Sequence, residues 1–372
     1  MNRTKQLRLL IITDFFYPHW TGISKSLFYL IKALDRDLLC TVLTVRYHKD
    51  LRSLDKILNT KIIREDVLFS LSRSKYSPRV MLRLLIIINQ HDVVLINSPS
   101  SNILPAAVIT KLFRKKLLIF HQGDLILPEG IANRIVEKIF DISAYLACVL
   151  SDKVSTYTKD YAKYSRLLKN FHEKFTPMIL PILIPGSLLL KKRQNKYIYF
   201  GFAGRFVEEK GFDILLDAIP EIVNSIPNAR FRYAGQLKMG YERFFEKNKN
   251  KFDKLKKYID FCGLLSDKEM LSFYDSIDFI IVPSRSDCFN LVQAEAMKSG
   301  VPSIAADIPG LRVLVKQTGF GVLFEKNNSV DLARKSVLAV AQRKKIMLRL
   351  ASVKTILDDK LNVKKITNFI TK

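Results

Sequence analysis

The sequence predicts an α/β protein made of two domains, each an open, doubly wound parallel sheet. Short apolar runs alternate with longer amphipathic stretches along most of the 372 residues, which is the pattern of parallel strands joined by crossover helices. The alternation breaks at 181–196, where two prolines, a glycine and a basic cluster follow one another. Such a segment is typical of an interdomain linker, and the chain length also favours two domains.

The expected strands form two series on either side of that break. The first series is Leu7–Thr13, Thr41–Arg46, Asp92–Asn97, Lys116–Phe120 and Lys153–Thr156. The second begins at Tyr197 and continues with Phe231–Ala234, Ile259–Cys262, Phe279–Val282 and Pro302–Ala305. The last stretch, Leu332–Lys372, has a helical period and lacks strand signals.

These patterns predict an N-terminal domain at 1–185, a linker at 186–196 and a C-terminal domain at 197–345. A helical segment at 346–372 could pack on either domain, including back on the N-terminal one. Ligands of open parallel sheets lie at the carboxyl ends of the strands, so two facing domains would form one cleft between them.

Charge is the most unusual bulk property of the chain. The formal net charge is +26 at pH 7 and is spread evenly over the two halves. Nucleic-acid binding is not favoured, because the sequence has no basic arm and no aromatic-basic repeat. Adsorption to an anionic membrane surface fits an even basic excess better, and a solvated basic surface with no partner stays open.

Composition and termini predict a cytoplasmic protein, soluble or peripheral on the inner face of the membrane. Hydrophobic residues make up 48% of the chain and charged residues 26%, as in folded globular proteins. The four cysteines are scattered and are expected to be reduced thiols. The basic start is followed by an apolar run too short for a signal peptide, and no run is long enough for a membrane span.

Two segments carry most of the functional information. In SDCFNLVQAEAMKSGVPSIA (286–305), a loop after a strand leads into a helix that starts near Asn290 and stops at Gly300. The amides of Phe289, Asn290 and Leu291 would point from the helix N-terminus, a geometry suited to a phosphate. The carboxylate of Glu295, within this helix, could accept two hydrogen bonds from a vicinal diol such as a ribose.

The second segment, FGFAGRFVEEKG (200–211), also follows a strand and opens a helix. Together the two segments resemble the retaining glycosyltransferases of the two-Rossmann (GT-B) architecture, specifically the large fourth family, glycosyl transferases group 1. The family pattern is E-G-F-G-L-V-x-x-E-A-M-A-x-G-x-P-V-I-A. This chain departs from it at Asp287, where glutamate is usual, and at Asn290, where glycine is usual.

The resemblance implies roles for the residues of the C-terminal domain. Glu295 would hold the nucleotide ribose, and Asp287 would contact donor-sugar hydroxyls with a side chain one methylene shorter than usual. Arg205 and Lys210 would bind the diphosphate and stabilise the charge on the leaving phosphate without a metal. Further donor-site positions implied by the match are Gly204, Gly235 in the strand-end loop, Leu265 in the segment against which the base packs, and the turn Asp307–Arg312.

The N-terminal domain matches less tightly. Gly22, in the loop after the first strand, resembles the family's glycine loop and would permit close backbone approach to the donor phosphates. His121, at the end of a strand, matches a histidine placed against the donor sugar. His19, in the same loop as Gly22, could equally be a functional residue or a structural one.

No metal or other cofactor is expected. Asp35 and Asp37 form a D-x-D, but two carboxylates at the end of a helix do not specify a metal site. The sequence has no zinc spacing and no G-x-x-x-x-G-K-[ST] phosphate loop.

The resemblance implies transfer of a hexosyl unit, with retention, from a UDP- or GDP-linked sugar to a saccharide or lipid-linked acceptor, as in surface polysaccharide synthesis. The resemblance also implies attack from the face that the diphosphate leaves, and no carboxylate is placed as a nucleophile. Three alternatives remain: a two-Rossmann sugar-nucleotide epimerase, a non-catalytic nucleotide-binding relative, and, on charge alone, a nucleic-acid binder.

Overall fold

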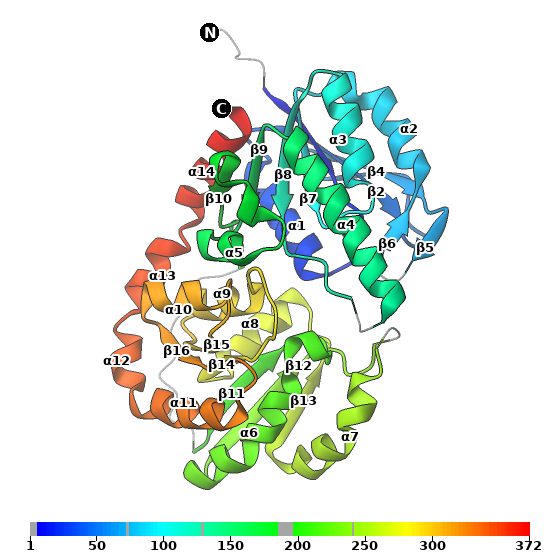
Figure 1. Cartoon of the computed structure of the whole chain (residues 1–372). Helices are drawn as coiled ribbons and strands as arrows, with labels where there is room; N and C mark the ends of the chain where they lie inside the picture. Colours follow the sequence, from blue (N-terminus) through cyan, green and yellow to red (C-terminus); the bar gives the residue numbers. More distant parts are fainter. Residues whose placement is uncertain (1–5, 72–73, 128–129, 185–195, 240–241) are drawn as a thin grey trace. The chain divides into compact units, whose positions relative to one another are not determined.

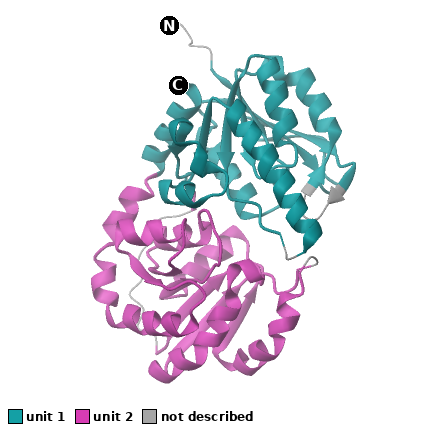
Figure 2. Ribbon diagram, viewed as in Figure 1, with its two compact units in different colours: residues 1–181, 359–372 teal, residues 182–358 magenta. Residues whose placement is uncertain are grey.

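A computed structural model shows two compact units, and it describes residues 6–71, 74–127, 130–184, 196–239 and 242–372. Unit 1 comprises residues 1–181 and 359–372, and unit 2 comprises residues 182–358 (Figure 2). Each unit is a parallel sheet with helices packed on it, as Figure 1 shows. The expected linker at 186–196 lies, except for residue 196, outside the described residues.

The sheet of unit 1 has eight strands in the order β10-β9-β8-β7-β1-β2-β4-β3. All neighbours pair in parallel except β3 and β4, which are antiparallel. The strands are β1 (Arg8–Ile12), β2 (Leu39–Arg46), β3 (Leu54–Ile57), β4 (Thr60–Asp66), β7 (Val93–Ser98), β8 (Lys116–His121), β9 (Lys153–Thr156) and β10 (Phe175–Pro177). A separate hairpin consists of β5 (Phe69–Leu71) and β6 (Ser74–Tyr76).

Helices cover this sheet and close its core. Aliphatic residues of β1, β7 and β8 are fully buried against α2, α3 and α4. The C-terminal helix α14 packs against α1, so the end of the chain belongs to unit 1. The helices are α1 (Gly22–Leu34), α2 (Pro78–Ile87), η1 (Ile88–Gln90), α3 (Ile103–Leu112), α4 (Ile131–Leu150), α5 (Lys159–Tyr164), η2 (Leu168–Asn170), η3 (His172–Lys174) and α14 (Asp359–Thr371).

The sheet of unit 2 is parallel throughout, with the order β13-β12-β11-β14-β15-β16. The chain winds outward from β11 in one direction and then from β14 in the other, so the switch point lies between these two strands. The strands are β11 (Ile198–Ala203), β12 (Ala229–Ala234), β13 (Ile259–Gly263), β14 (Phe279–Val282), β15 (Ser303–Ala306) and β16 (Gly321–Phe324).

An aromatic core holds unit 2 together. Phe200 stacks between Phe231 and Phe279 across three neighbouring strands, and Phe212 of α6 stacks on Tyr233. The helices are η4 (Glu208–Lys210), α6 (Phe212–Ser225), α7 (Phe244–Leu255), η5 (Lys256–Tyr258), α8 (Asp267–Asp275), α9 (Leu291–Lys298), α10 (Arg312–Thr318), α11 (Ser329–Ala341), α12 (Arg343–Met347) and α13 (Leu350–Ile356).

The predicted fold class of two doubly wound parallel-sheet domains is confirmed. Every expected strand is present, with ends within two residues of those predicted, and the C-terminal stretch is helical. The sequence pattern did not indicate β3, β4, β5, β6, β10 or β16. The units change at 181/182 and at 358/359, and residues 346–358 lie in unit 2 whereas 359–372 lie in unit 1.

Candidate active site

The candidate site of unit 2 is built by two loops that leave the sheet at its switch point. One loop follows β11 and ends in the 3-10 turn η4, and the other follows β14 and ends at the start of α9. Because β11 and β14 are paired neighbours, the two loops emerge side by side at the carboxyl edge of the sheet. The two segments that the sequence analysis singled out therefore converge.

At the centre of the convergence Lys210 and Asp287 form an ion pair. The Nζ of Lys210 lies 2.9 Å from Oδ2 of Asp287, and the two side chains are 19% and 11% exposed. Asn290 donates from Nδ2 to the same carboxylate oxygen at 2.9 Å. Burial lowers the pKa of the Lys210 ammonium, but the charges of Asp287 and Glu209 outweigh burial and raise it above its usual value, so Lys210 is a cation.

The position of Lys210 is fixed by its neighbours in the chain. Gly211 has φ of 67°, and a Cβ at this residue would lie 2.1 Å from the carbonyl oxygen of Pro283. The turn η4, which ends at Lys210, is therefore in close backbone contact with the residue that follows β14. Arg285 strengthens the contact, because its amide donates to the Glu209 carbonyl at 2.8 Å and its guanidinium to the Glu208 carbonyl at 2.6 Å.

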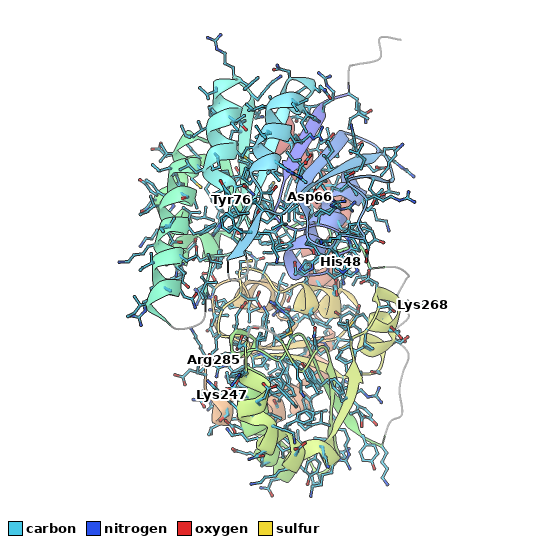
Figure 3. The ribbon with its side chains drawn as sticks, turned by 90° about the vertical axis from the view of Figure 1, so that its right-hand side faces the viewer. His48, Asp66, Tyr76, Lys247, Lys268 and Arg285 are labelled. Atoms are coloured by element: carbon cyan, nitrogen blue, oxygen red, sulfur yellow. The ribbon has the colours of Figure 1, made fainter. Side chains whose placement is uncertain are left out.

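Arg285 itself is held by a bidentate ion pair with Asp213 of α6, at 2.9 and 2.6 Å. Figure 3 labels Arg285 in unit 2. The hydrogen bond to Asp213 raises the pKa of the guanidinium further. The sequence analysis missed this residue, although a cation two positions before the acidic residue of a strand-end loop was a visible signal.

The helix α9 begins as predicted, and Asn290 is its N-cap. The Asn290 Oδ1 accepts from the amide of Gln293 at 2.9 Å, which is the usual satisfaction of a free helical N–H. Asn290 thus caps the helix with its oxygen and holds Asp287 with its nitrogen. The two departures from the family pattern, at Asp287 and Asn290, form one hydrogen-bonded arrangement.

Glu295 lies on α9 and is buried, with 3% of the residue exposed. Its Oε2 accepts a hydrogen bond from the hydroxyl of Tyr274 at 2.7 Å. Tyr274, at the end of α8, is also buried and was not predicted. The structure therefore places the predicted ribose carboxylate in a position fixed by a tyrosine.

The remaining predicted residues of unit 2 lie around these contacts. Phe289 and Leu291 are buried on either side of Asn290, and Arg205 and Leu265 are half-buried in the loops after β11 and β13. The amide of Gly204 donates to the Ala234 carbonyl at 2.9 Å, and that of Gly235 to the Gly263 carbonyl at 2.7 Å. In the turn after β15, a Cβ at Gly310 would lie 2.4 Å from the Asp287 carbonyl oxygen.

The predicted residues of unit 1 lie at the start of α1 and at the end of β8. Gly22 opens α1 directly after the N-cap Thr21. His121 ends β8 and is buried, with Nδ1 2.9 Å from Ser98 Oγ and Nε2 3.1 Å from Asp124 Oδ1. Burial raises the pKa of Asp124, but hydrogen bonds from His121, Ser165 and the Arg166 amide, and the charge of His121, outweigh burial and lower it to about 2.

A buried polar network beside His121 was also missed. Gln122 Oε1 accepts from Ser26 Oγ at 2.8 Å and from the Tyr157 hydroxyl at 2.7 Å, and its Nε2 donates to Asn97 Oδ1 at 2.6 Å. Single polar residues of this kind, separated by 25 to 96 positions in the chain, leave no local pattern in the sequence.

No group of three His, Cys, Asp or Glu residues that could hold a metal ion occurs in the described parts of the chain. The D-x-D residue Asp35 accepts from the backbone and side-chain nitrogens of Asn59 at 2.8 and 3.0 Å, so it ties the end of α1 to a turn. Among the described helices, none is long and apolar enough to cross a membrane.

Sequence comparison relates the chain to glycosyltransferases. Residues 198–342 match the family described as glycosyl transferases group 1. A protein of Methanocaldococcus jannaschii named an uncharacterized glycosyltransferase is 34% identical over 233 residues, which are 62% of this chain and 60% of the relative. An uncharacterized glycosyltransferase of Haemophilus influenzae is 27% identical over 72% of this chain and 71% of the relative. The chain thus matches about three fifths of the first relative's length.

Solved structures share the fold over almost the whole chain. Sucrose-phosphate synthase from Thermosynechococcus elongatus has a TM-score of 0.76 at 15% identity, covering 97% of this chain and 98% of that one. HepE from Anabaena, solved with UDP and glucose, has a TM-score of 0.73 at 14% identity, covering 98% and 100%. Residues 198–342 therefore match the glycosyl transferases group 1, and the two parallel-sheet domains of the chain have the GT-B fold.

Proposed function

We propose that the protein is a retaining glycosyltransferase that moves a hexosyl unit from a nucleotide-diphosphate sugar to a saccharide or lipid-linked saccharide. The observation that carries this proposal is the convergence of Lys210, Asp287 and Asn290 at the switch point of unit 2, at the start of the helix that bears Glu295. Open α/β sheets bind their ligands at this edge, and the residues combine a cation, sugar-binding polar groups and a buried carboxylate.

In the proposed reaction the bond between the anomeric carbon and the phosphate oxygen breaks, and a bond to the acceptor oxygen forms on the same face. The acceptor's proton passes to the departing phosphate oxygen. Arg205 and Lys210 stabilise the negative charge that develops on the diphosphate, together with the amides at Phe289, Asn290 and Leu291. Asp287 and His121 orient the sugar, and Glu295 binds the ribose.

Lys210 has a second role in this scheme, because it also neutralises Asp287. An ammonium shared between a carboxylate at 2.9 Å and an incoming phosphate loses less hydration on binding than one facing water. Donor binding would then draw Lys210 toward the phosphate and free the Asp287 oxygen for a sugar hydroxyl. In this way the Lys210–Asp287 pair would couple binding of the donor phosphate to binding of the donor sugar.

The donor nucleotide is proposed to be UDP or GDP, and no metal or other cofactor is required. The neighbour HepE was solved with UDP and glucose, which supports a uridine nucleotide. We place the protein in the cytoplasm, peripheral on the inner membrane face, extending a surface polysaccharide. The net charge of +26 supports this location.

The test is a panel of UDP-, GDP- and ADP-sugars with the purified chain, following nucleotide release with and without a membrane lipid extract. One donor is expected to release nucleotide, with activity unchanged by EDTA. Glu295→Gln keeps the size of the buried side chain and removes its charge. It is expected to lower kcat/KM at least 100-fold, because the lost free energy is that of one or more buried hydrogen bonds to a charged group. Glu221→Gln on the exposed face of α6 is the matched control.

Two outcomes would replace the proposal. Isomerisation of the nucleotide sugar without an acceptor would identify a sugar-nucleotide epimerase. Nucleotide binding with no release under any acceptor condition would identify a non-catalytic relative.

A further inference from the structure

The helix layer α2, α3 and α4 of unit 1 has an apolar outer surface. These helices lie side by side over the sheet, and α3 packs against both of the others (Figure 1). Along α4, six aliphatic residues are 43–80% exposed. They are Ile131, Ile135, Ile139, Ile142, Leu146 and Val149. Their spacing of three and four residues places them in one stripe along the helix.

The neighbouring helices extend this stripe. Leu82 and Ile86 of α2 and Leu112 of α3 are 60%, 66% and 74% exposed. We call these nine residues the apolar face of unit 1. A group of exposed apolar residues on adjacent helices indicates an interaction surface, whereas single exposed apolar residues do not.

The amphipathicity of α4 is inverted relative to an ordinary surface helix. Its fully buried residues are the small Ala144, Ala147 and Cys148, and its large aliphatic side chains face outward. Helix α6 of unit 2 provides the comparison within the same protein. There the aliphatic residues are buried, and the exposed positions include Asp217 and Glu221. The outward residues of α4 are therefore not required for the core of unit 1.

The exposed charged residues of these three helices are of one sign. The exposed residues of α2, α3 and α4 include Arg79, Arg134 and Lys138 and no Asp or Glu. The two acidic residues of α4, Glu137 and Asp141, are half-buried and pair with Arg166 at 3.9 and 3.0 Å. Arg79 pairs with Asp66 at 3.1 Å, so the surface combines aliphatic side chains with the exposed cations Arg134 and Lys138 of α4.

We propose that the apolar face of unit 1 docks on an anionic lipid bilayer, with α4 lying in the plane of the interface. Helices that bind in this way insert aliphatic side chains among the acyl chains while Lys and Arg contact anionic headgroups. Because four of the 20 residues of α4 are charged, the helix would lie in the interface and would not span the bilayer. A second copy of the chain fits less well, because it would bring like cations together. The inference rests on the peripheral location proposed above and adds its surface.

The experiment is flotation of the full chain with two kinds of vesicle, one of phosphatidylcholine alone and one with about a third phosphatidylglycerol. The apolar variant is Ile135→Asn, Ile139→Asn, Ile142→Asn, and the charge variant is Arg134→Gln, Lys138→Gln. The matched control replaces two exposed apolar residues of unit 2, Val330→Asn and Leu348→Asn, which are 64% and 83% exposed. All five substituted aliphatic positions, three in α4 and two in unit 2, lie on the surface, so circular dichroism should be unchanged.

The unmodified chain is expected to float with the anionic vesicles. The apolar variant should bind about 100-fold more weakly and the charge variant about 30-fold more weakly, whereas the unit 2 control should bind normally. Adsorption by net charge alone predicts instead that the apolar variant binds like the unmodified chain, which would overturn the docking surface. A dimer in solution that the apolar variant dissociates, without vesicle binding, would also overturn it in favour of a second copy.

Nucleotide release separates this inference from the proposed function. The apolar variant should release nucleotide from the donor in solution at the same rate as the unmodified chain. If no donor is turned over but anionic vesicles are bound through α4, the catalytic proposal fails and the docking surface stands.

Discussion

The ion pair between Lys210 and Asp287 should contribute measurably to the stability of unit 2. With about 4 Å between charge centres, the attraction is about 4 kcal/mol at an effective dielectric constant of 20 and about 1 kcal/mol in bulk water. The two side chains are 19% and 11% exposed, so the interaction energy should lie between these two values and nearer to the one for a dielectric constant of 20. A double-mutant cycle of Lys210→Met and Asp287→Asn should therefore give a coupling free energy of about 2 kcal/mol.

A second Lys–Asp pair in the same unit is the control. The Nζ of Lys251 lies 2.7 Å from Asp217 Oδ1, but these side chains are 52% and 44% exposed. Exposed pairs contribute little, so the cycle of Lys251→Met and Asp217→Asn should give less than about 0.5 kcal/mol. The N–O distance is shorter in the Lys251–Asp217 pair, which is expected to be the weaker one. The comparison therefore tests whether burial, and not distance, controls the coupling free energy.

Hydrogen–deuterium exchange of peptides covering β14, α9 and α6 measures the opening of unit 2 separately from unit 1. A coupling of about 2 kcal/mol corresponds to a difference of about 30-fold in exchange rate. Equal coupling in the two cycles would refute the argument, because burial would then not control the strength of the pair.

Three further predictions concern single residues. Gly310→Ala should destabilise unit 2 by more than about 3 kcal/mol in the same exchange assay, because its Cβ would lie 2.4 Å from the Asp287 carbonyl oxygen; Gly263→Ala, with a similar positive φ and open space, should cost only about 1 kcal/mol. Tyr274→Phe should raise the KM for the nucleotide sugar about tenfold and change kcat little, because it removes the hydrogen bond that fixes Glu295; steady-state kinetics showing the opposite split would contradict this. Asp124 has a pKa of about 2 in the folded protein against 3.8, so its contribution of about 2 kcal/mol is present above about pH 4 and is lost as the pH falls through about 2. The difference in urea stability between Asp124→Asn and the unmodified chain, followed by the fluorescence of the single tryptophan, Trp20 in unit 1, should shrink over that window, and a difference constant from pH 6 to pH 2 would contradict the assignment.

The sequence predicted the sheets well because their central strands are buried on both faces. Strands such as β7, which begins VVLI, and β14, which is FIIV, contain continuous apolar runs. Such runs can be recognised in the sequence without knowing which strands pair with them. The missed strands lie at or near the edges of the sheets. β3 is LDKI and half exposed, and it pairs through an antiparallel contact with β4 that no local pattern encodes.

The candidate site was predictable as a set of positions and not as a set of contacts. Motif order pointed to Lys210, Asp287 and Glu295, because each lies in a recognisable loop or helix. Tyr274 and Arg285 were missed because their roles arise from side chains that meet only after folding. Asn290 was read from the sequence as a departure from a pattern, whereas the structure shows it as the partner of Asp287.

Helix α14 gives unit 1 a particular order of assembly during synthesis. Its residues Ile366, Phe369 and Ile370 are buried, and Lys116 of β8 donates to the Ile370 carbonyl at 3.0 Å. The helix is encoded after the whole of unit 2, so the ribosome makes the last piece of the first unit after the second unit is complete. Unit 2 is continuous in sequence and can fold first. Until α14 is synthesised, the apolar surface beside α1 that it covers stays open, and a chaperone that binds exposed apolar surface would be needed during that interval.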